Sequence, residues 1–514
     1  MPETENAMTE NEQEKQEERI FVGRNDLFGR RKIFTSEEDI NEGNVISALN
    51  LALAVHVRNI EEEDYLHWYR KGRQPILLRR KRIRPEICNK VVINNANMVV
   101  TFKNGYFLTK PGNYVSRSAD EEIVKKVKAL NEFLYASGKP HADNTTVDNF
   151  HTVGLGVTYL EPNERKRKPI NVYALDPKQA FCVYSMRPGN PVKFAVNMVT
   201  TGNGLKFDVY TDTRIFHLIG GYAPVKVGSE EQMHPHGIAT DIVSVEENRI
   251  GMIPFVEYQY NANRMSAFES AISIMDDINN MESNRADGVE QQIQQLCIAY
   301  NCQFEDGVTA NSIREAGMIQ LKSVGDNKAD FKILTSELNQ TDTQTTIDSL
   351  YEQMLEKCGV PSSVRDGGST SDNVGAVYLR SGWASADTDA RNTEDLFRES
   401  DERFLEIFLR ILEQKNLLTG LEPEDVELVI ERNRMDNLVA KTQSALNMKM
   451  LGLAPEIVLE RSGLSTDPVK DIEVSKEWIF KSWDNSVNDT AKQPDRQWSN
   501  NGENPGDGNA VRSV

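Results

Sequence analysis

The chain has 514 residues, of which 59 are Lys or Arg and 78 are Asp or Glu, giving a formal net charge of −19. The length allows about three domains of roughly 150 residues each. The negative charge argues against a protein that coats DNA phosphates. Five cysteines without a CxxC pair argue against a disulfide framework and favour a reducing compartment. No run of 18 apolar residues occurs and the N-terminus is acidic, so we expect no membrane span and no secretory or mitochondrial targeting segment.

Both ends of the chain are polar. Residues 1–19 carry seven Glu against Lys15 and Arg19, and 15 of the 34 residues in 481–514 are Asn, Ser, Gly or Pro. Such segments have too little apolar surface to offset the entropy lost on ordering. We therefore expect a disordered acidic arm over 1–40 and a disordered tail over 481–514.

Residues 41–264 combine helical and strand patterns. Helical periodicity predicts helices over 42–58 and 120–136, the second ended by Gly138-Lys139-Pro140. Short stretches rich in β-branched and aromatic residues predict strands over 153–160, 170–175, 192–199 and 205–210. The turns between them indicate a mainly antiparallel sheet, so this region is predicted to be α+β.

From residue 265 the pattern becomes mostly helical. Apolar residues from Phe268 to Leu296 form one stripe that predicts a helix over 265–300. The opposite face is acidic and amide-rich, with a net −5 over 265–290 from Glu269, Asp276, Asp277, Glu282, Asp287 and Glu290 against Arg285. Such a one-sided charge is unusual for a solvated helix.

The remainder alternates helices with short excursions. Alternating residues around Gly-Asp-Asn predict a hairpin over 317–335, and a second helix is expected over 342–357. The Gly, Ser and Asp content of 362–375 predicts a loop, followed by a long amphipathic helix over 376–415. Residues 421–480 begin with a strand-like VELVIER and continue as short helices.

Familiar catalytic motifs are absent. There is no Walker loop, complete dinucleotide loop, HExxH, GxSxG or EF-hand sequence. His234-Pro235-His236 could share a cation, although no Cys or acid cluster stands beside it and a polar loop is the favoured interpretation. The run 70–84 holds eight Lys or Arg and no acid. It could contact phosphate, but pairing with acids of this chain or of a neighbouring subunit is favoured.

Several blocks taken together resemble tailed-bacteriophage portal proteins, in the branch common in phages of Gram-positive bacteria. The blocks occur in order over about 65–480. They are YLHWYRKGRQPILLRRK (65–81), KVVINNANMVVTFKNGYFLTKPGNY (90–114), the stretch from GMIPFVEYQYNANR to NRAD (251–287), the stretch from GGSTSDNVGAVYLRSGW to NTEDLF (367–397) and the helical tail ending in DPVKDIEVSKEW (429–478).

The resemblance implies a mostly helical α+β subunit of portal type. It would have an α+β wing over 41–264, stem helices over 265–290 and 339–360, and a small αβ clip over 291–338 between the stem helices. A tunnel loop over 361–376, a long wing helix over 377–420 and a helical crown over 421–480 would follow. The subunits would form a ring, usually of twelve, at one capsid vertex of the virion after assembly in the host cytoplasm. Double-stranded DNA would pass through it non-specifically during packaging and ejection.

The resemblance also implies partners and sites. The partners would be other copies of the chain, the terminase large subunit, a head-tail connector, and the major capsid and scaffolding proteins, with no membrane, no cofactor, no metal and no catalytic residue. The tunnel loop would face DNA through Arg365, Asp366, Gly367, Gly368, Ser369, Thr370, Ser371 and Asn373. A repelling channel wall would be made by Glu269, Asp276, Asp277, Glu282 and Asp287. The clip would dock partners through Lys322, Asp326, Lys328 and Lys332.

Two alternatives remain open at this point. One is a metal-dependent phage nuclease that uses His234, His236 and nearby acids, and the other is a monomeric adaptor that binds other head proteins. The absence of catalytic motifs favours a structural protein over an enzyme.

Overall fold

The computed structural model describes residues 29–475, apart from 83, 119, 202–203, 228–229, 294–295, 301, 304–321, 324–329, 335–339, 363–381, 431, 433–437, 466–470 and 473. For 222–236 and 291–340 the description is confined to the backbone. The chain divides into two compact units, Met1–Met435 and Asp436–Val514. The architecture is mixed α+β, as predicted.

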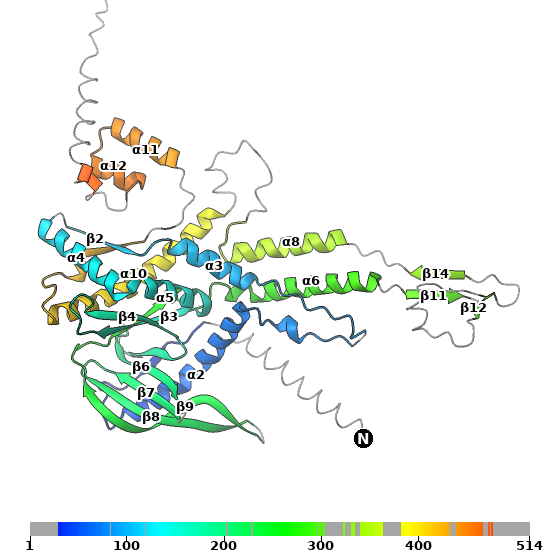
Figure 1. Cartoon of the computed structure of the whole chain (residues 1–514), viewed down its shortest axis with the longest axis horizontal. Coiled ribbons are helices and arrows are strands. Elements are labelled where there is room, and N and C mark those ends of the chain that lie inside the picture. The colour runs from blue at the N-terminus through cyan, green and yellow to red at the C-terminus, as the bar shows by residue number, and fades with distance from the viewer. Residues whose placement is uncertain are drawn as a thin grey trace, which may run out of the picture. The chain divides into compact units, whose positions relative to one another are not determined.

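A six-stranded sheet covered by a long helix forms one part of the first unit (Figure 1). Its strand order is β1-β5-β6-β7-β8-β9, antiparallel except for the parallel pair β1 and β5. The bounds are β1 Ile33–Thr35, β5 Ala180–Ser185, β6 Val192–Thr201, β7 Gly204–Tyr210, β8 Arg214–Val227 and β9 Glu230–Glu247. Helix α2, Val45–Arg70, buries Leu49 and Leu53 in the same cluster as Phe194 and Phe207 of the sheet.

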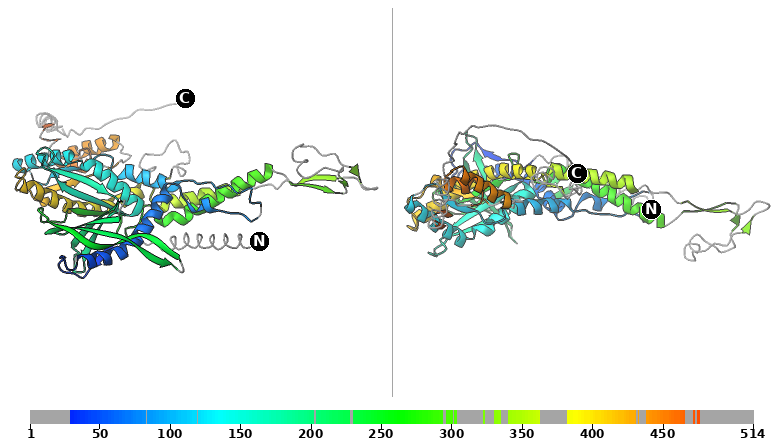
Figure 2. Two further views of the ribbon diagram at one scale, coloured as in Figure 1. Left: turned by 60° about the horizontal axis from the view of Figure 1, so that its bottom comes forward. Right: turned by 90° about the horizontal axis from the view of Figure 1, so that it is seen from above.

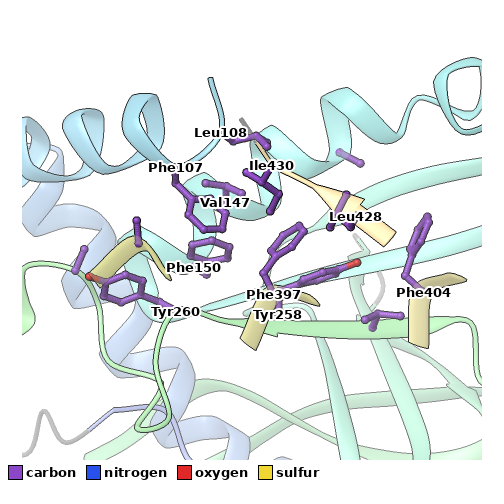
Figure 3. Packing of buried hydrophobic residues seen from close by; sticks show 14 of the residues in the cluster. Phe107, Leu108, Val147, Phe150, Tyr258, Tyr260, Phe397, Phe404, Leu428 and Ile430 are labelled. Atoms are coloured by element: carbon purple, nitrogen blue, oxygen red, sulfur yellow. The ribbon is translucent and has the colours of Figure 1, made fainter. Parts of the chain in front are cut away.

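A second layer packs helices on a three-stranded sheet with the order β10-β3-β4. The strands are β3 Leu155–Pro162, β4 Ile170–Leu175 and β10 Phe255–Gln259. The helices are α3 Asn95–Phe107, α4 Glu121–Ser137, α5 Lys139–Val153 and α10 Trp383–Gln414. Aromatic rings from these elements meet in the largest core cluster (Figure 3), with Phe107 5.8 Å from Phe150 and Tyr258 4.7 Å from Phe397 between ring centroids.

The same core contains a buried charge centre. The Lys139 ammonium on α5 donates to Asp143 Oδ1 at 2.8 Å and to Asp401 Oδ1 of α10 at 3.0 Å. Tyr114 of β2, Asn113–Ser116, donates its hydroxyl to Asp401 Oδ2 at 2.7 Å. Burial raises the pKa of Asp143 to about 6, against the pull of the Lys139 cation. One ammonium, that of Lys139, therefore contacts two carboxyl groups in this centre. The carboxyl group of Asp143 has a raised affinity for a proton.

Several predicted elements are confirmed. Helix α4 and strand β4 match the predicted ranges within a residue or two, and β6 and β7 cover the two further predicted strands. Gly138, with φ +86°, ends α4 and also begins α5, because the backbone N–H of His141 bonds back to its carbonyl. Helix α2 runs 12 residues beyond the predicted end at residue 58.

The predicted disordered arm over 1–40 is wrong for its last part. Residues 1–28 lie outside the described residues, but Ile33 is buried and β1 pairs with β5. The Arg30 guanidinium is also buried, 2.8 Å from Glu269 and 3.2 Å from Glu62. These contacts provide the partners that a short polar segment needs to become ordered.

Strand pairing corrects one further prediction, the hairpin over 317–335, and confirms another, the strand in VELVIER. In the described part of 317–335, β13 Lys322–Ser323 pairs with β12 Cys302–Gln303, and β14 Asp330–Leu334 pairs with β11 Leu296–Tyr300. The predicted local hairpin is therefore replaced by pairing with the preceding chain. The strand in VELVIER, β15 Val426–Val429, pairs with β2 in the first unit, after the short turn η3 Pro423–Asp425.

The second unit is described for two helices and the residues near them. Helices α11, Leu438–Met450, and α12, Pro455–Ser462, are in contact, and Val458 is buried. Gly463, with φ +62°, ends α12. Short helices were predicted here.

Candidate functional site

Two helices lie side by side in all views (Figures 1 and 2). They are α6, Ile272–Ile293, and α8, Gln340–Lys357. The first begins directly after the short 3-10 helix η2, Glu269–Ala271. The strand after α6, β11, pairs antiparallel with β14 before α8, so the chain leaves along one helix and returns along the other. Met275 of α6 and Met354 of α8 are fully buried in the core cluster. The predicted helix over 265–300 is thus shorter, because residues from 296 form a strand.

One face of α6 binds an extended segment of the chain. Successive side chains on this face accept backbone N–H groups: Asn279 from Ile93 at 2.8 Å, Ser283 from Val91 at 3.0 Å and Asp287 from Asn89 at 2.6 Å. We call this arrangement the polar ladder. Four helical residues rise about 6 Å, and two extended residues span about 6.6 Å. The two spacings match closely enough for three consecutive bonds.

Two cations bind the Asp287 end of the polar ladder. Arg79 lies 3.0 Å from Asp287 Oδ2, and Lys81 pairs with the same oxygen. Burial alone would raise the pKa of Asp287, but the hydrogen bonds from Lys81 and Asn89 outweigh it and the pKa lies below its usual value. The Asp287 carboxylate is therefore ionised, and it is already bound by groups of the same subunit.

The five acids predicted to form a channel wall do not share one environment. Glu269, Asp276 and Asp287 are buried, and their partners are in the same chain: Arg30 for Glu269, the Tyr69 hydroxyl at 2.9 Å for Asp276, and the ladder for Asp287. The expectation that these three present charge to a channel needs correction, because the face that carries them is covered. Asp277 is exposed, and Glu282 is half-buried, 3.5 Å from Arg285.

Another face of α6 is open to solvent. Its exposed residues follow helical spacing and are small and polar: Ser273, Asp277, Asn280 and Asn284. We call this set the α6 stripe. It contains a single acidic residue, Asp277, so the surface that α6 offers is far less acidic than the −5 counted along its sequence.

The basic run 70–84 is partly used inside the subunit. Arg70 lies 2.7 Å from Asp148, and Arg79 and Lys81 pair with Asp287. The prediction that this run pairs with acids of the chain is confirmed for these three residues. The extended segment after the run was missed as a partner of α6. The signal available for it was the series of polar residues at intervals of four on α6, Asn279, Ser283 and Asp287.

The remaining predicted site residues are placed only in part. Arg365, Asp366, Gly367, Gly368, Ser369, Thr370, Ser371 and Asn373 of the predicted tunnel loop lie outside the described residues, as do Asp326 and Lys328. Lys322 lies on β13 and Lys332 on β14, and their side chains are not described. Their roles remain predictions.

The His234-Pro235-His236 sequence lies on strand β9. In the described part of the chain, no three His, Cys, Asp or Glu side chains are grouped as they would be to bind a metal ion. Across the same residues, none of the helices has the length and apolar character needed to cross a membrane.

The comparison with curated proteins returned no match. A comparison with protein-family models gave a match over residues 56–479, which include both helices, the polar ladder and most of the core layers. The matching family is described as phage portal protein, SPP1 Gp6-like. Because the match covers far more than half of the sequence, the chain belongs to this phage portal protein family.

Proposed function

We propose that the chain assembles into a ring at one vertex of a phage capsid and forms the channel through which double-stranded DNA is packaged and later ejected. Family membership supports a phage portal role in general. The observation that supports the channel most directly is the pair α6 and α8 with its open polar stripe. The stripe carries one acid and no cation, so a ring of such stripes would attract DNA phosphates only weakly.

In this proposal the polar ladder has a supporting role. It anchors α6 to the segment 89–93 through three side chains. The α6 stripe stays exposed, and its member Asn284 accepts a hydrogen bond from Arg79. The predicted tunnel loop between α8 and α10 would make the closest contacts with DNA, through groups that contact the backbone without reading sequence. The excursion that includes β11 and β14 would dock the terminase motor and the head-tail connector, with Lys322, Asp326, Lys328 and Lys332 among the contacts. The role is structural, and it requires no cofactor and no metal.

The first experiment is imaging of the purified chain by negative-stain electron microscopy, together with its mass in solution. We expect rings with a central hole, and masses that are multiples of the 58.1 kDa subunit. A stable monomer at all salt and protein concentrations would refute the ring and favour the monomeric adaptor. Cation-dependent cleavage of plasmid DNA that is lost in His236→Ala would instead favour the nuclease.

A second experiment addresses the α6 stripe. Asp277→Lys is expected to leave rings intact and slow DNA packaging, because each subunit would then present a cation to phosphate. Asp277→Asn is the matched variant that removes the acid without adding a cation, and it should package close to the wild-type rate. Equal packaging by all three proteins would contradict a DNA-facing stripe. Deletion of 365–372 is likewise expected to preserve rings and impair packaging or retention.

A further inference from the structure

The two partners of α6 lie on opposite sides of that helix. Ser283, which binds the extended segment, and Arg285, which donates to Gln344 of α8, are two residues apart. At 3.6 residues per turn this places them about 200° apart around the axis. Figure 1 agrees, with α8 on one side of α6 and the segment that follows α2 on the other. The subunit therefore has two flanks, with the α6 stripe between them.

The flank formed by the segment after α2 is basic. Arg70, Arg79 and Lys81 are paired within the chain. The other five cations of the run have no ion pair to an acid in the described part of the chain: Lys71, Arg73, Arg80, Arg82 and Arg84. Four of these five, all but Arg84, are exposed. A chain with a net charge of −19 thus concentrates free positive charge at this flank.

The same flank exposes apolar surface. Trp68 is 40% exposed, and the Arg73 guanidinium lies 4.1 Å from the centroid of its ring system. Leu77 and Leu78 of η1, Pro75–Leu78, are 39% and 48% exposed. Trp and Arg are the residue types most enriched at the energetic centres of protein interfaces. We call Trp68, Lys71, Arg73, Leu77, Leu78, Arg80 and Arg82 the basic flank.

The opposite flank is the outer surface of α8, and it is acidic. This helix carries Asp342, Asp348, Glu352 and Glu356 against a single cation, Lys357. Asp342, Asp348 and Glu356 are exposed, and Glu352 is half-buried. Apart from these acids, Tyr351, Leu350 and Lys357, the outward positions are Thr, Ser and Gln. Lys357 at the end of the helix is therefore the one exposed cation on the described part of α8.

We propose that the basic flank of one subunit docks onto the acidic face of α8 of a second copy of this chain. The inference rests on the proposed ring and names the surfaces that close it. Two different surfaces on opposite sides of one helix make a head-to-tail contact, and repetition of such a contact closes into a ring when the rotation per subunit permits. Charge complementarity selects the pairing and suppresses contacts between like flanks.

A second copy explains the basic flank better than DNA does. Phosphate binding needs accessible cations and gains nothing from two exposed leucines and a tryptophan covered by Arg73. A protein surface that is acidic and partly apolar satisfies both kinds of group. The α6 stripe would then lie between neighbouring contacts, free to face the channel.

The test uses two complementary variants of the full chain. The first is Arg80→Glu with Arg82→Glu, and the second is Asp348→Lys with Glu352→Lys. Each variant alone places like charges across every contact, so the protein concentration at which rings form should rise at least roughly 100-fold. At concentrations where the wild type forms rings, each variant should have a mass near 58.1 kDa. An equimolar mixture places opposite charges across every contact and should recover rings, with the two variants alternating.

Circular dichroism of each variant establishes that it is folded. Lys125→Glu is the control, because Lys125 is an exposed cation on α4 with 78% of its side chain accessible, and this variant should form rings as the wild type does. Rings from either flank variant alone, at the wild-type concentration, would overturn the inference while leaving the proposed channel intact. So would rings that form normally and have lost binding to a short DNA duplex. Failure of the mixture to assemble would also overturn the inference, whereas a monomeric wild type would overturn the proposed function itself.

Discussion

The buried charge centre predicts an unusual dependence of stability on pH. Asp143 is enclosed between α5 and α10, and two opposing effects act on its carboxyl group. Lys139 at 2.8 Å favours the ionised form, while burial and the neighbouring Asp401 favour the neutral form. Burial dominates, and the pKa rises from 3.8 to about 6. Replacing Asp143 by Asn removes this titration and keeps the shape of the side chain and the ion pair from Lys139 to Asp401.

The size and sign of the effect follow from linkage. In the unfolded chain the carboxyl group loses its proton near pH 3.8, whereas in the folded protein it does so near pH 6. The stability contributed by the neutral carboxyl group is present below pH 3.8 and is lost as the pH rises through 6. A rise from 3.8 to about 6 corresponds to roughly 3 kcal/mol. Between pH 4 and pH 7, wild type should therefore lose up to about this amount of stability relative to Asp143→Asn.

The assay is urea unfolding of both proteins at one protein concentration between pH 4 and pH 7, followed by tryptophan fluorescence and circular dichroism. The quantity compared is the difference between the two proteins, because assembly and several cooperative units affect each curve separately. Glu121→Gln on α4 is the control, since Glu121 is 86% exposed and should give no such difference. If wild type instead gains stability over Asp143→Asn as the pH rises, Lys139 dominates and the argument from burial is wrong.

Three further variants test packing and hydrogen bonding by the free energy of unfolding. Ser283→Ala leaves the Val91 N–H without its acceptor and should cost about 1 kcal/mol, while Ser273→Ala on the exposed stripe should cost nothing measurable; equal effects would contradict the polar ladder. Gly154→Ala should cost more than 2 kcal/mol, because φ is +91° and the new Cβ would lie 2.0 Å from a backbone carbonyl oxygen; a loss below 1 kcal/mol would show that this loop can shift. Lys139→Met removes the cation from two buried carboxyl groups and should cost about 3–5 kcal/mol at neutral pH; a loss below 1 kcal/mol would show that the ammonium does not stabilise these carboxyl groups.

Local signals were sufficient for several elements of the fold. Helix α4 has a regular apolar face, an Asp120 side chain that accepts the Glu122 N–H, and Gly138 at its end. Each of these signals lies within a few residues of the structure it determines. Strand β4 is likewise bounded by proline and aspartate at its two turns. Periodicity and turn chemistry fix such elements without reference to the rest of the chain.

The environment of α6 could not be predicted from periodicity. A polar face looks the same in sequence whether it contacts water or the backbone of another segment. The partner of Asn279, Ser283 and Asp287 is 186–198 residues away in the sequence. It contributes mainly backbone N–H groups, which leave no trace in the side-chain pattern of the segment that carries them. The predicted net charge of α6 was a correct count of its charged residues, but it did not describe the charge of the exposed surface. The prediction of a hairpin over 317–335 failed for the same reason. The strands within that range, β13 and β14, pair with β12 and β11, which lie outside it.

The polar ladder also fixes the rotational setting of α6. Turning the helix by one residue, about 100°, or sliding it by 1.5 Å would misalign all three bonds together, at a cost of about 3 kcal/mol. The rotation of α6 about its own axis is therefore set by the segment 89–93. Because the segment 89–93 leads directly into α3, the polar ladder also ties the surface that α6 presents to the position of α3.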